Sequence, residues 1–254
     1  MNPEFFRFAV LLLLAHLLGD FVLQVEWIQR RKKHWYGRLV HSLIHAALAY
    51  LLVGAWSAWL IPLVTGVTHY LIDWGKSALN TRRFRIFVID QVLHGLVIAG
   101  IAYLLSQSAF RPFWLAWQPE IAWAVAVITA AYLLLVPCGG FLIGGLMVPY
   151  QAQLDRRARE LAKSKPGEEK KMIKGFSEGG RIIGYLERLL ILVFVLSSQY
   201  AGIGFLVAAK SIFRFGEFKE SENRMEAEYI IIGTFASFLY AIVVSQAVQW
   251  LLKQ

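Results

Sequence analysis

Long apolar segments alternate with short charged or aromatic connections along this chain. Several of the segments reach about 18 residues or more, which is the length of a helix that crosses a lipid bilayer. The pattern therefore predicts an all-α fold, a polytopic transmembrane helix bundle of about 7–8 spans. The apolar segments are residues 5–25, 39–56, 61–78, 86–105, 121–150, 182–199, 203–213 and 229–251.

One of these segments, 121–150, is long for a single span and is interrupted by the sequence PCGG at 137–140. Proline removes a backbone donor and glycine loosens a helix, so we expect a kinked helix near 137–140. The charged stretch that follows is interpreted as a cytoplasmic linker. The chain is then one transmembrane domain, 1–254, whose parts are a His/Asp half (1–110), a connecting and kinked helix (111–150), the linker (151–180) and a C-terminal helical half (181–254).

Composition and charge agree with a membrane protein. The chain has 254 residues, of which 57% are hydrophobic, and a formal net charge of +9; its mean hydropathy is +0.52. Charged, mostly basic connections (26–38, 76–86, 151–180, 214–227) alternate with nearly uncharged ones (57–60, 107–120, 199–202). Because basic connections face the cytoplasm, we expect both termini outside and segment 203–213 either crossing the membrane or re-entering it. The same rule accounts for the positive net charge, so we expect no nucleic-acid partner.

Four polar pairs with the spacing i, i+4 lie inside the first four apolar segments. Residues four apart share one face of a helix, so each segment presents two side chains in one direction. Ionisable groups inside a membrane span are costly and indicate a functional site. With the topology above, all four pairs fall at one depth, in the cytoplasmic third of the bilayer. The pairs are His16/Asp20, His41/His45, His69/Asp73 and Asp90/His94.

These eight side chains predict a metal site. Imidazole and carboxylate groups bind Zn, Mn or Fe, and Cys138, the only cysteine, leaves no CxxC site. We expect one or two divalent ions, with Zn first among the three metals. Either two ions share a bridging carboxylate, or some aspartates orient histidines. Asp20, Asp73 and Asp90 are the candidate catalytic residues. The alternative is a purely structural hydrogen-bond cluster.

Further polar residues are candidates for binding a substrate. Lys76 follows Asp73 by three residues, and it either holds an anionic group or reaches the interface as a lysine at a span end. The C-terminal half adds Glu187, Arg188, Lys210 and Arg214, which bind a head group or pair with one another. Gln24 and Gln91 lie on or beside the ligand helices and are expected to support them. His34, in a basic connection, is expected to be solvated.

The chain resembles a bacterial membrane family, domain of unknown function 3307, over most of its length except 151–178. The stretches that carry the resemblance are HLLGDFVLQ (16–24), HSLIHA (41–46), HYLID (69–73), DQVLH (90–94), GYLERLLI (184–191), AAKSIFRF (208–215) and EYIIIGTFAS (228–237). The resemblance implies a multi-pass protein of the bacterial inner membrane. More distantly, the His/Asp pattern is similar to membrane-bound metal-dependent hydrolases, which implies metal-assisted hydrolysis with the eight residues as ligands.

The sequence therefore predicts a metal-dependent hydrolase that acts at the cytoplasmic side on a membrane-associated, anionic substrate, such as a lipid or lipid-linked phosphoester. A metal or proton transporter is one alternative, although the ligands cluster at a single depth. A metal-stabilised scaffold or sensor is another; it would bind a cytoplasmic partner through 151–178. A homo-oligomer is compatible with all three. Closed coordination would favour the scaffold, and an open ligand position beside a lipid-accessible cleft would favour the enzyme.

Overall fold

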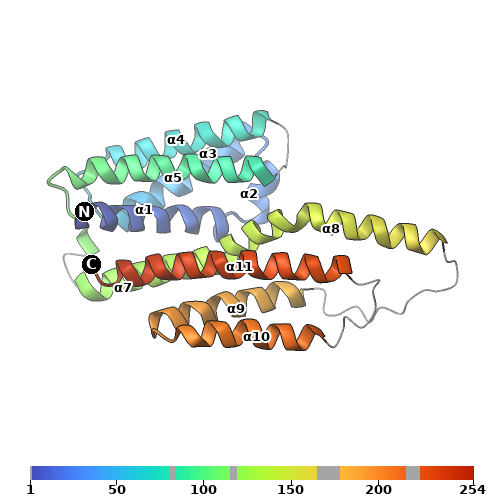
Figure 1. Ribbon diagram of the computed structural model, residues 1–254. Helices are drawn as coiled ribbons and strands as arrows, with labels where there is room; N and C mark the ends of the chain where they lie inside the picture. Colours follow the sequence, from blue (N-terminus) through green and yellow to red (C-terminus); the bar gives the residue numbers. More distant parts are fainter. Residues whose placement is uncertain (1, 80–83, 115–118, 165–177, 216–223) are drawn as a thin grey trace. The chain divides into compact units, whose positions relative to one another are not determined.

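The computed structural model describes residues 2–79, 84–114, 119–164, 178–215 and 224–254. All regular structure in these ranges is helical, as predicted (Figure 1). The chain forms two compact units, Met1–Leu134 with Trp250–Gln254, and Leu135–Gln249.

The first unit is built on a ring of four helices. Helix α1 packs against α3 and α5, and α4 closes the ring by packing against both α3 and α5 (Figure 1). The short helix α2 lies against α3, and α7 lies against α1. Phe8 and Leu17 of α1 are at most 2% exposed, because neighbours cover this helix on several sides. The helices are α1 (Pro3–Phe21), α2 (Glu26–Arg31), α3 (Trp35–Val53), α4 (Leu60–Ala78), α5 (Phe84–Ser106) and α7 (Pro119–Leu133).

Local signals fix the ends of these helices. Asn2 caps α1, with its Oδ1 accepting a hydrogen bond from the amide of Glu4 at 3.0 Å, and Pro3 follows at the first helical position. Helix α3 ends at Gly54, which adopts the left-handed conformation with φ of 64°. One sequence interpretation was wrong: the connection 26–38 contains helix α2. The acidic first turn and basic last turn of α2 favour a helix, although the many charged residues of this connection are more typical of a loop.

The second unit contains α8 (Gly139–Ser164), α9 (Gly179–Leu196), α10 (Tyr200–Phe215) and most of α11 (Arg224–Leu251). Helix α9 packs against α8 and α10. Gln249 on α11 donates a hydrogen bond to the carbonyl of Val195 on α9 at 2.7 Å. Helix α8 continues through the first part of the predicted linker to Ser164, and residues 165–177 lie outside the described ranges.

A π-helical turn, Leu134–Cys138, joins α7 to α8 and contains Pro137. The irregularity predicted near residues 137–140 is thus present, as a change of hydrogen-bond pattern within a continuous helical run. Proline lacks the amide that a regular helix needs, and a π turn redistributes the backbone carbonyls. The carbonyl of Leu135 accepts a hydrogen bond from the side chain of Arg188 on α9.

Four helical segments in the described ranges are long and apolar enough to cross a membrane: Trp35–Val53, Phe84–Ser106, Pro119–Glu160 and Arg224–Leu251. Large apolar side chains on them face outward, for example Leu104 at 70% exposure. These features are typical of a membrane protein. The count of seven to eight spans stays a prediction, because polar residues interrupt α1, α4 and α9 and because α10 is short.

Candidate metal centre

The four predicted pairs converge inside the ring of helices in the first unit. Helices α1, α3, α4 and α5 each contribute one pair. The five histidines are buried, at 0–7% exposure, as are Asp73 and Asp90, and the side chain of Asp20 is 11% exposed. The imidazole rings lie close together: ring centroids are 3.6 Å apart for His45 and His69, and 4.2 Å apart for His69 and His94. Helix packing therefore gathers side chains that lie up to 78 positions apart along the chain.

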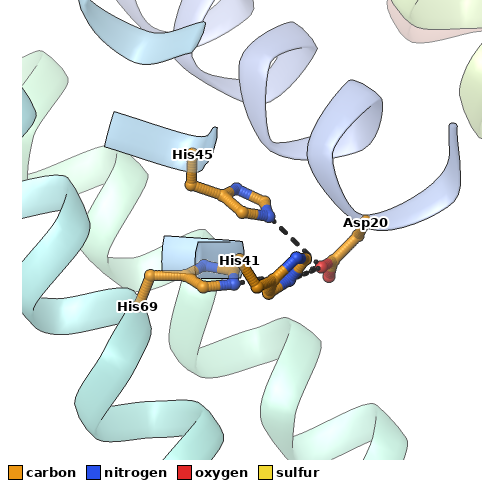
Figure 2. A group of neighbouring side chains, drawn as sticks. All are labelled: Asp20, His41, His45 and His69. Atoms are coloured by element: carbon orange, nitrogen blue, oxygen red, sulfur yellow. Dashed lines mark hydrogen bonds and ion pairs between the residues drawn. The ribbon is translucent and has the colours of Figure 1, made fainter. Parts of the chain in front are cut away.

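Four of these side chains have the spacing of a tetrahedral metal site. Asp20 Oδ1 lies 3.0 Å from His41 Nε2, 3.4 Å from His45 Nε2 and 3.9 Å from His69 Nε2 (Figure 2). With zinc–ligand bonds of about 2.0–2.1 Å, the ligand atoms of a tetrahedral site lie about 3.4 Å from one another. We call Asp20, His41, His45 and His69 the first ligand set. Their ligand atoms all lie within 4.8 Å of one another, which is close enough for them to hold one ion.

A second ligand set consists of His16, His69 and His94, whose nitrogen atoms also lie within 4.8 Å of one another. His69 belongs to both sets. A neutral imidazole has one nitrogen with a free lone pair, so His69 in this form binds one ion. The two sets are therefore adjacent positions for a cation that compete for one ligand.

Two buried nitrogens of the first ligand set bear on the choice between a metal site and a purely structural cluster. His45 Nε2 and His69 Nε2 are fully buried and have no hydrogen-bond partner among the described residues. Buried polar atoms in native proteins are nearly always paired, because leaving one unpaired costs about 1–3 kcal/mol. Hydrogen bonds within the cluster explain the approach of His41 to Asp20, but they leave these two nitrogens unexplained. A cation held by the first ligand set would give both nitrogens a partner.

The other two aspartates are held by lysines. Lys32 Nζ lies 2.9 Å from Asp73 Oδ2, and Lys76 Nζ lies 2.7 Å from Asp90 Oδ2. Asp73 Oδ2 is also near the first ligand set, at 3.8 Å from His41 Nε2 and 3.7 Å from His69 Nε2. These two carboxylates therefore line the centre with their charge already neutralised.

Lys32 is the residue of this centre that the sequence did not indicate, since it lies in a run of basic residues. The corner between α2 and α3 directs it inward. Gly37 packs so closely on the carbonyl of Arg31 that an added Cβ would lie 2.1 Å from its oxygen. Buried Arg38 donates hydrogen bonds to the carbonyls of Lys32 and Lys33 at 3.2 and 3.1 Å. Gln24, which was expected to have a supporting role, accepts from Lys32 Nζ at 3.3 Å.

Gln91 connects several members of the cluster, as expected of a supporting residue. Its Nε2 donates to Asp20 Oδ2 at 3.3 Å and to Asp90 Oδ2 at 3.2 Å. Its Oε1 lies 3.3 Å from His16 Nε2, which must donate because an amide oxygen only accepts. Gln91 therefore orients Asp20 so that Oδ1, the other oxygen, points to the first ligand set.

Two features set the histidine geometry on α3 and α5. An added Cβ at Gly19 would lie 2.4 Å from the ring of His45, so only glycine lets this imidazole approach α1. On α5, His94 Nδ1 lies 3.1 Å from the carbonyl oxygen of Asp90. Because a carbonyl cannot donate, Nδ1 carries the proton and Nε2 keeps its lone pair. The lone pair of His94 therefore faces the other imidazoles.

A cavity of about 30 Å³ borders this cluster inside the ring. Four imidazoles line it (His16, His45, His69 and His94), and the remaining lining side chains are apolar or threonine. The volume accommodates on the order of two water molecules. The cavity thus lies beside both ligand sets and leaves room for a small non-protein ligand next to a bound ion.

The other predicted substrate-binding residues lie in the second unit, where they bond with neighbours. Lys210 Nζ donates to Glu187 at 2.7 Å, and Arg188 donates to Ser237 Oγ at 3.0 Å as well as to the carbonyl of Leu135. Arg214 is in α10, and its side chain lies outside what the structure describes. In the first unit, His34 is exposed and stacks on Tyr36 at 5.4 Å, apart from the cluster, as expected.

Comparison with known proteins finds a family to which part of the chain is similar. Residues 8–120 match the model of a family described as "Protein of unknown function (DUF3307)". The matched segment contains all eight predicted ligands, whereas the stretches 184–191, 208–215 and 228–237 lie outside it. Searches of curated proteins and of solved structures found no match. The similarity to metal-dependent hydrolases stays a prediction. Residues 8–120 are thus similar to the DUF3307 family, as the sequence motifs in this part of the chain predicted.

Proposed function

We propose that this protein is a membrane-embedded, metal-dependent hydrolase of a membrane-associated, anionic substrate. The observation that carries the proposal is the cavity beside the histidine cluster. Hydrolytic metal sites keep a position open for water or substrate next to the ion, and structural sites do not. Here His45 and His69 belong to the first ligand set and also line the cavity.

Asp20, His41, His45 and His69 would hold the ion. A divalent ion in such a site acts as a Lewis acid and supplies an activated water for attack on a phosphoryl or carbonyl group. Asp20 would contribute Oδ1 to the ion, while Gln91 holds its Oδ2. Zinc suits the tetrahedral spacing, and Mn or Fe would bind the same donor atoms.

His94 is the best placed proton acceptor. Its Nε2 lone pair is buried, has no hydrogen-bond partner among the described residues, and lies in the wall of the cavity. The aspartates predicted to be catalytic have other contacts. Asp73 and Asp90 form ion pairs with Lys32 and Lys76, so we propose that they hold these lysines in place and that the Asp90 pair also positions α5. Asp20 is assigned to the ion.

The cavity walls and the nearby charges suggest the substrate class. Apart from the four imidazoles, the side chains that line the cavity are mostly apolar, such as Leu12, Ile98 and Ile101. Lys76 is the most exposed charged group of the cluster, with its side chain 36% exposed. An amphiphile with an anionic head group matches this combination, and a lipid or lipid-linked phosphoester is the simplest example. The substrate-binding role of Glu187, Arg188, Lys210 and Arg214 stays a prediction.

Hydrolysis by protein in detergent micelles tests the proposal. Metal-loaded protein is expected to release the head group or phosphate from at least one member of a panel of phosphatidic acid, phosphatidylglycerol phosphate and a polyprenyl diphosphate. The His94→Gln variant should keep its metal and lose about 10²- to 10⁴-fold in turnover, which is the usual loss when a general base is removed. Turnover that persists in the presence of a chelator, or no turnover of any panel member, would contradict the proposal.

A metal-stabilised scaffold is the second candidate, and the first ligand set favours it because four protein ligands can close a tetrahedral site. Both candidates predict that a chelator lowers the thermal unfolding midpoint, since bound metal stabilises the folded state. The scaffold alone predicts metal binding without turnover. The His94→Gln variant separates them further, because His94 is no ligand in the first set and its loss should leave a scaffold unaffected.

We also propose seven to eight spans in a bacterial inner membrane, with the basic connections in the cytoplasm and both termini outside. In a Cys138→Ala background, Lys33→Cys should resist a membrane-impermeant thiol reagent added to intact cells. Ser57→Cys, in a nearly uncharged connection, should react under the same conditions and serves as the matched control. Strong labelling at position 33 before lysis would reverse the proposed orientation.

A further inference from the structure

The lysines of the centre have no role in holding or activating an ion, yet their ammonium groups lie inside the cluster. Lys32 and Lys76 come from different parts of the first unit, and each contacts one carboxylate, Asp73 or Asp90, at 2.9 Å or less. The side chain of Lys32 is only 19% exposed. Removing an ammonium group from water is costly, so such an arrangement calls for an explanation.

The first observation concerns the number of ions. Two ligand sets lie side by side, so the geometry alone would admit two cations. The sets share His69, however, and a neutral imidazole offers one lone pair. A second ion would therefore have to use His16 and His94 together with another anionic ligand. Asp20 Oδ2 lies 3.6 Å from His16 Nε2, but it already accepts a hydrogen bond from Gln91. The other two carboxylates, Asp73 on the helix of His69 and Asp90 on the helix of His94, are both engaged by lysine.

The second observation concerns charge. Of the three carboxylates in the cluster, Asp20 alone has no lysine or arginine partner among the described residues. Arg38, which is buried at the nearby corner, adds positive charge; it donates to two backbone carbonyls and lies over the ring of Tyr70. One divalent ion bound to Asp20 compensates the carboxylate charge that no lysine or arginine neutralises. A second divalent ion would add two uncompensated charges in a low-dielectric interior.

We propose that Lys32 and Lys76 restrict this centre to a single divalent ion by occupying the carboxylates that a second ion would need. The inference rests on the proposed metal site and deepens it: the ion is held by the first ligand set, and the lysines act as tethered cations at the second position. His16 and His94 then line the cavity without binding a second ion.

Native mass spectrometry of the full-length protein, purified without a histidine tag and incubated with excess Zn²⁺, tests this inference by counting the ions on single molecules. Wild-type protein is expected to carry one ion. The Lys32→Met/Lys76→Met variant frees Asp73 and Asp90 and should carry two. Lys33→Met, which removes an exposed neighbouring lysine, should carry one.

A charge-matched variant separates the effect of the lysines from general disturbance of the fold. Replacing Lys32 and Lys76 by Met together with Asp73→Asn and Asp90→Asn removes both partners of each pair, and it should return the count to one. If the double lysine variant does not fold, Lys76→Met alone, at the more exposed pair, should still show a population with two ions. Two ions on wild-type protein, or one ion on the folded lysine variants, would overturn the inference and leave the hydrolase proposal standing. No ion on wild-type protein would remove both.

Discussion

Replacing His69 by alanine is expected to remove bound metal altogether, from about one ion per chain to less than about a tenth. His69 belongs to both ligand sets, so no alternative position remains that keeps its full set of ligands. The first set would be reduced to Asp20, His41 and His45, and the second to two histidines. Losing one of four ligands also exposes the remaining donors to competition from protons and from Lys32.

The measurement is metal content by inductively coupled plasma mass spectrometry on protein purified without a histidine tag. His34→Ala is the matched control, because His34 is exposed, stacks on Tyr36 and lies apart from the cluster. It should retain the wild-type content. A His69→Ala protein that folds and still holds its metal would show that the ion is bound elsewhere in the chain.

The second large effect is expected at Arg188 in the second unit. Arg188 is 3% exposed, and its guanidinium donates to the Leu135 carbonyl of the π-helical turn and to Ser237 on α11. Arg188→Met would leave both acceptors buried without their donor, at a cost of about 2–5 kcal/mol. The thermal unfolding midpoint should fall on the order of 5–15 °C. Arg181→Met, on the exposed side of the same helix, should have little effect.

This variant also tests the substrate-binding role that the sequence predicted for Arg188. If Arg188 mainly holds the π-helical turn, stability falls while metal content is unchanged, because the ligands of the first unit are untouched. An unchanged unfolding midpoint with lost turnover would instead assign Arg188 to the substrate. Circular dichroism in detergent and the lipid phosphoester assay distinguish the two outcomes.

The candidate site was predictable to a large extent because helix geometry is local. A spacing of four residues places His41 and His45 on one face whatever the rest of the chain does. Four apolar segments with such faces can only satisfy them by turning them toward one another, since lipid offers no partner. The eight predicted ligands therefore gather in the ring of helices, and Gln24 and Gln91 lie beside them as supporting residues.

The details that the sequence did not predict depend on contacts between elements. Lys32 looks like any other basic residue of its connection, and its inward direction follows from the packing of Gly37 on Arg31 and from the bonds of Arg38. The sequence also could not rank the aspartates. Asp20 faces the histidines while Asp73 and Asp90 meet lysines, and this difference arises only when α1, α4 and α5 pack together.

The same limit applies to the helix ends. Helix α1 stops at Phe21, and the apolar residues up to position 25 form the turn into α2, where Val22 and Val25 are about half exposed. Hydropathy alone cannot separate these apolar turn residues from a span. The π-helical turn at Pro137 was easier to anticipate, because a missing amide disturbs a helix in any surroundings.

The metal content of the wild-type protein tests the central claim most directly. Protein purified in detergent without a histidine tag, never exposed to a chelator, should contain about one transition-metal ion per chain, with zinc first among the candidates. X-ray absorption at the metal edge should then show imidazole nitrogens and a carboxylate oxygen at about 2.0–2.1 Å. Less than about a tenth of an ion per chain, with no uptake of added Zn²⁺, would contradict the account.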